Sequence, residues 1–249
     1  MANKIQNEHS QQSDKTAAPE LPPGVKLVHT LRGDRGAAGR LAWSPDGHIL
    51  VSTSLVARIR LWDAKTGDCL LTIAGNRNMV FGVTFDPEGR TLASGSGDHT
   101  IQLWEARKGQ LLRTLKEHKD SVYSVAFDQT GSTLASGSYD RTIKLWEVES
   151  GRLLRTLEGH TSYVQDVAFL FNDQLVASKA GDNSVRLWDS DSGACLSIIP
   201  EQSSNIWPPG LAFHPHLPLL ATVGSDLGMP KDECDSLIHI YELDLALLL

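Results

Sequence analysis

The clearest alternation of apolar and polar positions in the chain runs from Gln110 to Gly151. Four short segments rich in leucine, β-branched or aromatic side chains lie within it, and Gly, Asp, Lys or Thr residues separate them. In order, the segments are LLRTL, VYSVAF, TLASGS and TIKLWEV. Apolar side chains at or near every second position predict β-strands. Because the connections are so short, we expect the four strands to form one antiparallel meander.

This pattern recurs at a fixed interval. A Leu-Trp pair followed by an acidic residue appears every 42 residues, with the indoles at Trp62, Trp104, Trp146 and Trp188. A strict interval near this length, closing each time on the same motif, is typical of a β-propeller blade. The expected units span residues 26–67, 68–109, 110–151, 152–193 and 194–249.

The motifs resemble those of the WD-repeat (WD40) β-propeller family. Leu61-Trp62-Asp63, Leu103-Trp104-Glu105, Leu145-Trp146-Glu147 and Leu187-Trp188-Asp189 carry the resemblance, with Gly159-His160 and the Ser-Gly-Ser runs at 94–96 and 136–138. It covers most of the chain and implies an all-β fold, a propeller of five four-stranded blades over residues 25–249. It also implies that Leu27–Leu31 pairs with Leu237–Leu243 as the outer strand of blade five. That pairing would close the ring within one chain and remove an exposed sheet edge.

The first and fifth units depart most from the pattern. Val56 stands where the second and third units carry Asp98 and Asp140. In the fifth unit we expect strands at 210–213, 219–223 and 237–243, the last with Tyr in place of Trp. The extra residues Leu227–Ser236 are expected to be a surface insertion.

Composition and charge exclude several classes of function. A net charge of −7 argues against a surface for nucleic acid or anionic membrane. Residues 1–24 are polar and lack the apolar core of a secretion signal, so we expect a disordered tail. No apolar run is long enough to span a membrane. Three cysteines do not form a disulfide framework in a chain this long, and together these features predict a cytoplasmic protein.

Two sets of four side chains sit at positions that the family resemblance assigns to a hydrogen-bonded tetrad. They are His118, Ser136, Asp140 and Trp146, and His160, Ser178, Asp182 and Trp188. A buried indole N–H needs an acceptor, and a serine hydroxyl can accept it while donating to histidine. Ser, His and Asp also form hydrolase triads, but no nucleophile-elbow sequence accompanies them. Because the set is duplicated in register with Trp as a fourth member, we expect a structural role and no catalytic residue.

No metal or cofactor is expected. His214 and His216 have the spacing of metal ligands, but no third ligand is evident nearby, and they fall where other units place a turn. Glycine-rich phosphate loops are absent, since the glycines of Ala-Ser-Gly-Ser lie within predicted strands.

A further set of positions flanks the valine that opens the second strand of each unit or precedes the tetrad aspartate. The family resemblance places these positions on the top face of the ring, where partners often bind. They hold mostly large side chains, namely Met79, Phe81, Tyr123, Tyr139, Tyr163, Gln165 and Trp207. Exposed aromatic residues and Met are enriched at interfaces, so we expect a partner-binding face. The alternative is that some of them pack between blades.

These features predict a non-enzymatic scaffold that binds a protein or peptide on its aromatic top face. The alternative is an architectural subunit whose five blades are completed by a partner or by self-association. Fold alone does not identify the partner or fix the oligomeric state.

Overall fold

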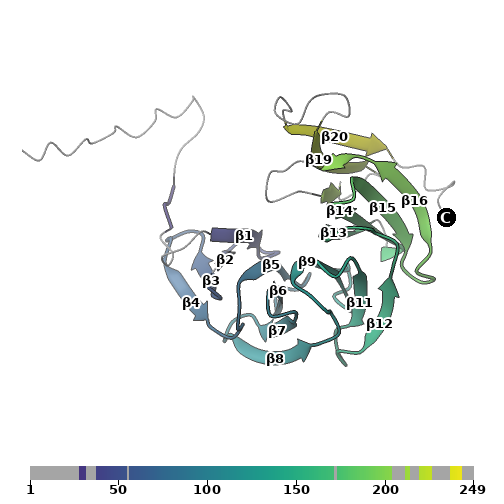
Figure 1. Cartoon of the computed structure of the whole chain (residues 1–249). Coiled ribbons are helices and arrows are strands. Elements are labelled where there is room, and N and C mark those ends of the chain that lie inside the picture. The colour runs from purple at the N-terminus through teal and green to yellow at the C-terminus, as the bar shows by residue number, and fades with distance from the viewer. Residues whose placement is uncertain are drawn as a thin grey trace, which may run out of the picture. The chain divides into compact units, whose positions relative to one another are not determined.

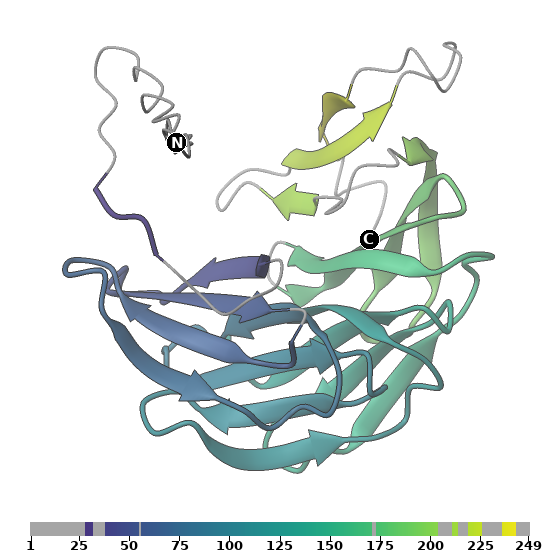
Figure 2. The same ribbon diagram turned by 60° about the vertical axis from the view of Figure 1, so that its left-hand side comes forward.

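The computed structural model describes residues 28–31, 38–54, 56–170, 173–203, 211–213, 219–225 and 236–242. Its regular structure consists of antiparallel β-sheets (Figures 1 and 2). Blade 1 contains β1 (Ala38–Trp43), β2 (Ile49–Ser54), β3 (Ile59–Asp63) and β4 (Cys69–Ile73). Blade 2 contains β5 (Val80–Phe85), β6 (Thr91–Ser96), β7 (Ile101–Glu105) and β8 (Gln110–Leu115).

Two more blades follow the same plan. Blade 3 contains β9 (Val122–Phe127), β10 (Thr133–Ser138), β11 (Ile143–Glu147) and β12 (Leu153–Leu157). Blade 4 contains β13 (Val164–Leu170), β14 (Leu175–Ala180), β15 (Ser184–Asp189) and β16 (Cys195–Pro200). In each blade the strands pair in sequence order as an antiparallel meander. The prediction of an all-β protein with propeller-type blades is therefore confirmed for these four sheets.

The repeat unit and the blade are offset by one strand. The first strand of each repeat pairs with the Trp strand of the preceding repeat, as β12 does with β11. These outer strands expose most of their side chains, whereas the two middle strands are largely buried. Successive repeats are therefore tied together by backbone hydrogen bonds as well as by packing.

The core lies between neighbouring blades. Leu61 and Ile73 of blade 1 share one buried cluster with Trp104 of blade 2. The same arrangement recurs between blades 2 and 3 around Trp146, and between blades 3 and 4 around Trp188. Trp104, Trp146 and Trp188 therefore each pack the indole against the preceding blade, which explains why the largest apolar side chain recurs at one register.

The last part of the chain forms a fifth sheet with a different strand order. β17 (Gln202–Ser203) and β18 (Leu211–Phe213) both pair with β19 (Leu219–Ser225), and β20 (Ser236–Glu242) pairs along the whole of β19. Because β20 occupies one edge of β19, β17 and β18 share the other edge. The three strands expected in this unit are present, but a complete fifth blade is not shown, so the count of five blades stays a prediction.

One expected strand is wrong. Val28 to Leu31 lie outside any strand, and β20 has β19 as its pairing partner within the described residues. A short apolar segment has no intrinsic reason to stay extended unless another strand supplies its hydrogen bonds. The expected closure of the ring through this strand is therefore not seen among the described residues. The tail at residues 1–24 and the insertion, apart from Ser236, lie outside the described residues. Within the described part, no helix is long and apolar enough to cross a membrane.

Candidate functional site

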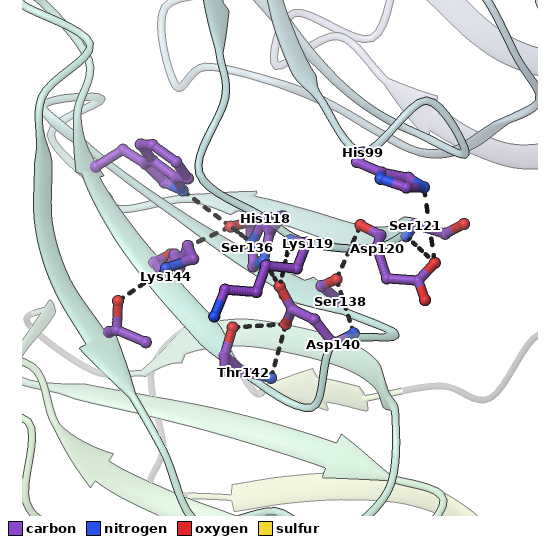
Figure 3. Close-up of polar contacts among 12 residues, drawn as sticks. His99, His118, Lys119, Asp120, Ser121, Ser136, Ser138, Asp140, Thr142 and Lys144 are labelled. Atoms are coloured by element: carbon purple, nitrogen blue, oxygen red, sulfur yellow. Dashed lines mark hydrogen bonds and ion pairs between the residues drawn. The ribbon is translucent and has the colours of Figure 1, made fainter.

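In blade 3 four side chains from separate segments form one chain of hydrogen bonds (Figure 3). Trp146 Nε1 on β11 donates to Ser136 Oγ on β10 over 2.9 Å. Ser136 Oγ lies 2.7 Å from Nε2 of His118, and His118 Nδ1 lies 2.8 Å from Oδ2 of Asp140. The tetrad therefore connects the loop before β9, the strand pair β10–β11 and the turn between these two strands.

The protonation of this chain follows from burial. Burial lowers the pKa of His118, although Asp140 opposes the shift. Burial also raises the pKa of Asp140, but hydrogen bonds from His118, Thr142 and the Lys119 amide outweigh it and hold that pKa below its ordinary value. A neutral imidazole beside a carboxylate carries its proton on the nitrogen that faces the carboxylate, which in His118 is Nδ1. His118 therefore donates a hydrogen bond to Asp140 through Nδ1 and accepts one from the Ser136 hydroxyl at Nε2.

Blade 4 repeats this geometry with His160, Ser178, Asp182 and Trp188. The Trp188–Ser178, Ser178–His160 and His160–Asp182 distances are 2.8, 2.7 and 2.8 Å. Each aspartate also accepts a hydrogen bond from the backbone N–H of the residue that follows its histidine. This residue is Lys119 in blade 3 and Thr161 in blade 4. The carboxylate thus fixes the loop as well as the imidazole.

Blades 1 and 2 carry only part of the network. In blade 2, Trp104 donates to Ser94 over 2.9 Å, but Asn76 replaces the histidine. Ser94 reaches Asn76 Oδ1 at 3.4 Å, and the buried Nδ2 of Asn76 has no hydrogen-bond partner. In blade 1, Trp62 donates to Ser52 over 2.8 Å, and Asp34, at the histidine position, lies outside the described residues.

The serine hydroxyls of both tetrads are closed to a substrate. Ser136 and Ser178 are fully buried, and each hydroxyl already bridges Trp and His. A catalytic serine must present its oxygen to an incoming carbonyl beside an oxyanion site. The buried serine hydroxyls do not meet this requirement, and the hydrogen bonds of each tetrad tie a loop, a strand pair and a turn together. Across the described part of the chain, three or more His, Cys, Asp or Glu side chains do not gather as metal ligands. His214 and His216 lie outside that part.

On the face beside the tetrad turns, four rings from blades 2 to 4 form a continuous cluster, here called the aromatic cluster. Tyr123 lies at its centre, with edge-to-face contacts to Phe81, Tyr139 and Tyr163 at centroid distances of 4.9, 5.9 and 6.1 Å. Tyr139 and Tyr163 are stacked, with centroids 5.3 Å apart and ring planes 12° apart. Four of the expected top-face side chains are thus brought together.

Tyr139 occupies a position that is glycine in the neighbouring blades. A Cβ on Gly181 would lie 2.8 Å from the Tyr163 ring, and one on Gly97 would lie 3.3 Å from Phe81. Those two rings therefore rest against backbone, whereas the Tyr139 ring projects and is 48% exposed. Met79 is 40% exposed, and Phe81, Tyr123 and Tyr163 are half-buried. Burial, then Tyr139, Tyr163 and Asp120, raises the pKa of Tyr123.

Gln165 and Trp207 were also expected on the top face. Gln165 was expected to be exposed, but it is 4% exposed, so that expectation is wrong. It lies on the inner strand β13 beside Asp166, and its Nε2 approaches the Tyr163 hydroxyl at 3.5 Å while its Oε1 has no hydrogen-bond partner. Trp207 lies outside the described residues.

The sequence patterns did not point to a charged contact between the inner strands. Arg40 on β1 forms an ion pair of 2.9 Å with Asp166 on β13, and Ser124 on β9 donates to the same carboxylate over 2.6 Å. Arg40, Ser124 and Asp166 are separated by multiples of 42 residues. Comparing this register across repeats, in addition to the Trp register, would have placed them on equivalent strands.

Comparison with known protein families identifies a repeat family. The family model for the WD domain, G-beta repeat (WD40) matches residues 25–63, 67–105, 109–147 and 151–189. These segments make up more than half of the chain and correspond to its first four repeats. No curated protein matches the chain.

Proposed function

Because the chain belongs to the WD40-repeat family, we propose that it is a non-enzymatic scaffold that binds a protein or peptide at its aromatic cluster. WD40 repeats generally mediate protein–protein interactions, and proteins built from them are typically not enzymes. The buried tetrads support the same reading, since their Ser, His and Asp side chains hold loops in place. The partner surface must then lie elsewhere on the blades.

The observation that carries this proposal is the exposed ring of Tyr139. Blades 2 and 4 have glycine at its position, so the fold of a blade does not require a side chain there. A half-exposed aromatic ring stacked on a second ring offers a rigid apolar surface at low cost in conformational entropy. Aromatic side chains at the centre of an interface supply much of its binding energy. Tyr139 is therefore proposed as the main anchor, with Met79, Phe81, Tyr123 and Tyr163 beside it.

Charge supports a partner segment that carries Lys or Arg. The chain has a net charge of −7, and the half-exposed carboxylate of Asp120 is close enough to Tyr123 to raise the pKa of its hydroxyl. A cation placed over an aromatic ring beside such a carboxylate is attracted by both groups. The same charge disfavours nucleic acid as the partner.

The experiment that tests this function begins with an unbiased pull-down on the full chain, followed by calorimetric titration of the partner so identified. Tyr139→Gly installs the residue of the neighbouring blades and is expected to weaken binding by about 1 to 2 kcal/mol or more. Leu112→Ala, at an exposed position of outer strand β8, is the matched control and should leave affinity unchanged. Unchanged affinity in Tyr139→Gly would place the binding surface elsewhere. Trp207→Ala then tests the remaining top-face candidate.

A second function, that of an architectural subunit, is favoured by one feature of the fifth sheet. Within the described residues β20 pairs on one edge only, and Ile240 on this strand is 69% exposed. An unpaired edge is a site where another strand can add. Light scattering distinguishes the two proposals, because a stable dimer or larger assembly supports the architectural role and a monomer supports the scaffold.

A further inference from the structure

A cavity of about 550 Å³ lies between blades 3 and 4. Its walls include residues of the turns that join β9 to β10 and β11 to β12 in blade 3, and β13 to β14 and β15 to β16 in blade 4. The tetrad turns join β10 to β11 and β14 to β15, at the other ends of these strands. The cavity is therefore on the face opposite the aromatic cluster.

The charged side chains that line this cavity differ in how they are paired. Arg152 forms an ion pair with Glu147 at 3.4 Å, and Arg155 donates from Nη1 to the Ser192 carbonyl over 3.2 Å. Three aspartates also line the cavity, and within the described residues none of them forms an ion pair: Asp128, Asp173 and Asp191. The cavity therefore presents carboxylates that no cationic side chain of the described part contacts.

Asp128 is the most buried of these aspartates, at 5% exposure. Its Oδ2 accepts hydrogen bonds from the Thr130 and Ser132 hydroxyls, each over 3.0 Å, but its buried Oδ1 has no hydrogen-bond partner. A buried carboxylate oxygen without a donor is costly. The turn itself does not impose this cost, because at the equivalent position in blade 2 Asp86 Oδ1 accepts the Arg90 N–H over 2.8 Å. Asp128 thus has room for a donor that a ligand supplies.

Asp173 stands where the other three blades have glycine. Its φ is 61°, in the left-handed region that disfavours a side chain, and the equivalent residues have φ values of 72°, 68° and 73°: Gly47, Gly89 and Gly131. Asp173 Oδ1 accepts the Gln129 N–H over 2.9 Å. At the position of Gln129 the two preceding repeats have Pro45 and Pro87, which have no N–H to donate. A carboxylate anchored across the seam in this way is therefore particular to blades 3 and 4.

The two carboxylates are close enough to affect each other. Burial raises the pKa of Asp173 above its ordinary value, the Gln129 amide opposes the shift, and the Asp128 carboxylate adds to it. A cation between the two aspartates would relieve this repulsion. Within the described residues, three or more His, Cys, Asp or Glu side chains do not gather as metal ligands, so the arrangement favours a larger cation.

The remaining wall of the cavity is partly apolar. It includes Leu154, which is 41% exposed, and the half-buried ring of Phe169. An arginine side chain matches both kinds of wall, since its aliphatic stem packs on apolar surface and its planar guanidinium stacks on aromatic rings. The guanidinium also has five N–H donors in a fixed fork, which suits two neighbouring carboxylates.

We propose that this cavity binds an arginine side chain of a protein partner, with the guanidinium between Asp128 and Asp173 and the stem against Leu154 and Phe169. It is a second binding surface, on the face opposite the aromatic cluster, and it does not depend on that cluster.

Titration of the full chain with the peptide acetyl-Gly-Arg-Gly-amide, followed by NMR, tests this proposal. The backbone amides of Gln129 and Gln174 should shift saturably, because Gln129 donates to Asp173 and Gln174 lines the cavity. Asp128→Asn should weaken the affinity read from these amides by roughly tenfold or more, through loss of a charged acceptor. Asp86→Asn, at the same turn position in blade 2, is the matched control and should leave the affinity unchanged.

A second variant keeps the test decisive if Asp128→Asn does not fold. Asp173→Asn retains an oxygen for the Gln129 N–H and a residue that tolerates positive φ, so it should fold and should also weaken binding roughly tenfold. The neutral peptide acetyl-Gly-Gln-Gly-amide should not bind at this cavity. Equal affinity for both peptides, or arginine-dependent shifts confined to amides of the aromatic cluster, would overturn the proposal. So would a response of Gln129 and Gln174 to CaCl2 with none to the arginine peptide.

Discussion

Arg40 and Asp166 occupy equivalent positions three repeats apart, and their side chains meet at 2.9 Å. Position 82, between them in register, is a glycine whose Cβ would lie 3.0 Å from the backbone oxygen of Tyr123. The inner strands of blades 2 and 3 therefore approach very closely. Gly82 lets the inner strand of blade 2 approach that of blade 3. The Arg40–Asp166 ion pair joins the inner strands of blades 1 and 4, and Ser124 of blade 3 donates to the same carboxylate.

Breaking this pair should destabilise the protein. Asp166→Ala leaves the partly buried guanidinium of Arg40 without this carboxylate and Ser124 without its acceptor. We expect the free energy of unfolding to fall by about 1.5 to 3 kcal/mol, the usual range for hydrogen bonds to charged groups. Urea denaturation measures the loss. Arg113→Ala, an exposed position on outer strand β8, should stay within about 0.5 kcal/mol of wild type.

The Asp140 carboxylate should matter for stability and not for binding. It accepts hydrogen bonds from His118, Thr142 and the Lys119 amide, so Asp140→Ala removes support from the imidazole and the turn together. A loss of about 1.5 to 3 kcal/mol is expected, visible by calorimetry as a lower melting temperature. Partner affinity of the folded fraction should persist. A normal melting temperature with lost affinity would contradict the structural role.

Lowering the pH should decrease the free energy of unfolding over two separate pH ranges. Burial lowers the pKa values of His118 and His160 below their ordinary 6.5, so the unfolded state binds more protons as the pH falls past 6.5. Stability from these groups is complete above pH 6.5 and is lost below it. The pKa values of Asp140 and Asp182 are lowered from 3.8, so a second loss begins as the pH approaches that value. Urea titrations between pH 8 and 4 should show the first loss, and a flat profile over that range would contradict it.

The sequence predicted what repetition makes visible. All four indoles donate to a serine hydroxyl, and three of them pack against the preceding blade. Their 42-residue spacing therefore located the sheets and the tetrads together. Gln165 shows where this reasoning fails, because a register that is half-buried at Phe81 and Tyr123 in blades 2 and 3 is fully buried in blade 4. Lys179, which forms a buried ion pair with Glu201, was missed because motif matching looks for residues that recur, and blades 2 and 3 carry Gly95 and Gly137 at its position.

Other expectations depended on contacts with distant parts of the chain, which a local sequence pattern does not reveal. Val28–Leu31 has the composition of a strand, but a strand forms only where another one supplies hydrogen bonds. The cytoplasmic location also stays a prediction, since it rests on composition and on the scarcity of cysteine. The family resemblance, applied to the register of the repeats, placed the aromatic side chains on one face. The stacking of Tyr139 on Tyr163 could not be predicted, because it depends on how two side chains from neighbouring blades are oriented in space.

The incomplete tetrad of blade 2 offers a gain of stability. Arg77 N donates to Asp98 Oδ2 over 2.9 Å, as Lys119 N does to Asp140, so the backbone and carboxylate of blade 2 already have the geometry of a complete tetrad. Asn76 is too short to link Ser94 to Asp98, and its buried Nδ2 is left without a partner. An unsatisfied buried donor costs about 1 to 3 kcal/mol. Asn76→His should remove that cost by bridging Ser94 and Asp98.

We therefore expect Asn76→His to raise the free energy of unfolding by about 1 to 2 kcal/mol, measured by urea denaturation at pH 8, where the imidazole is neutral. The reverse change in blade 3, His118→Asn, recreates the defect and should destabilise by a similar amount. The new histidine should also steepen the loss of stability below pH 6.5, because it adds a third buried imidazole that must be neutral in the folded state. A destabilised Asn76→His variant would show that blade 2 cannot admit the ring and that its asparagine reflects tighter packing.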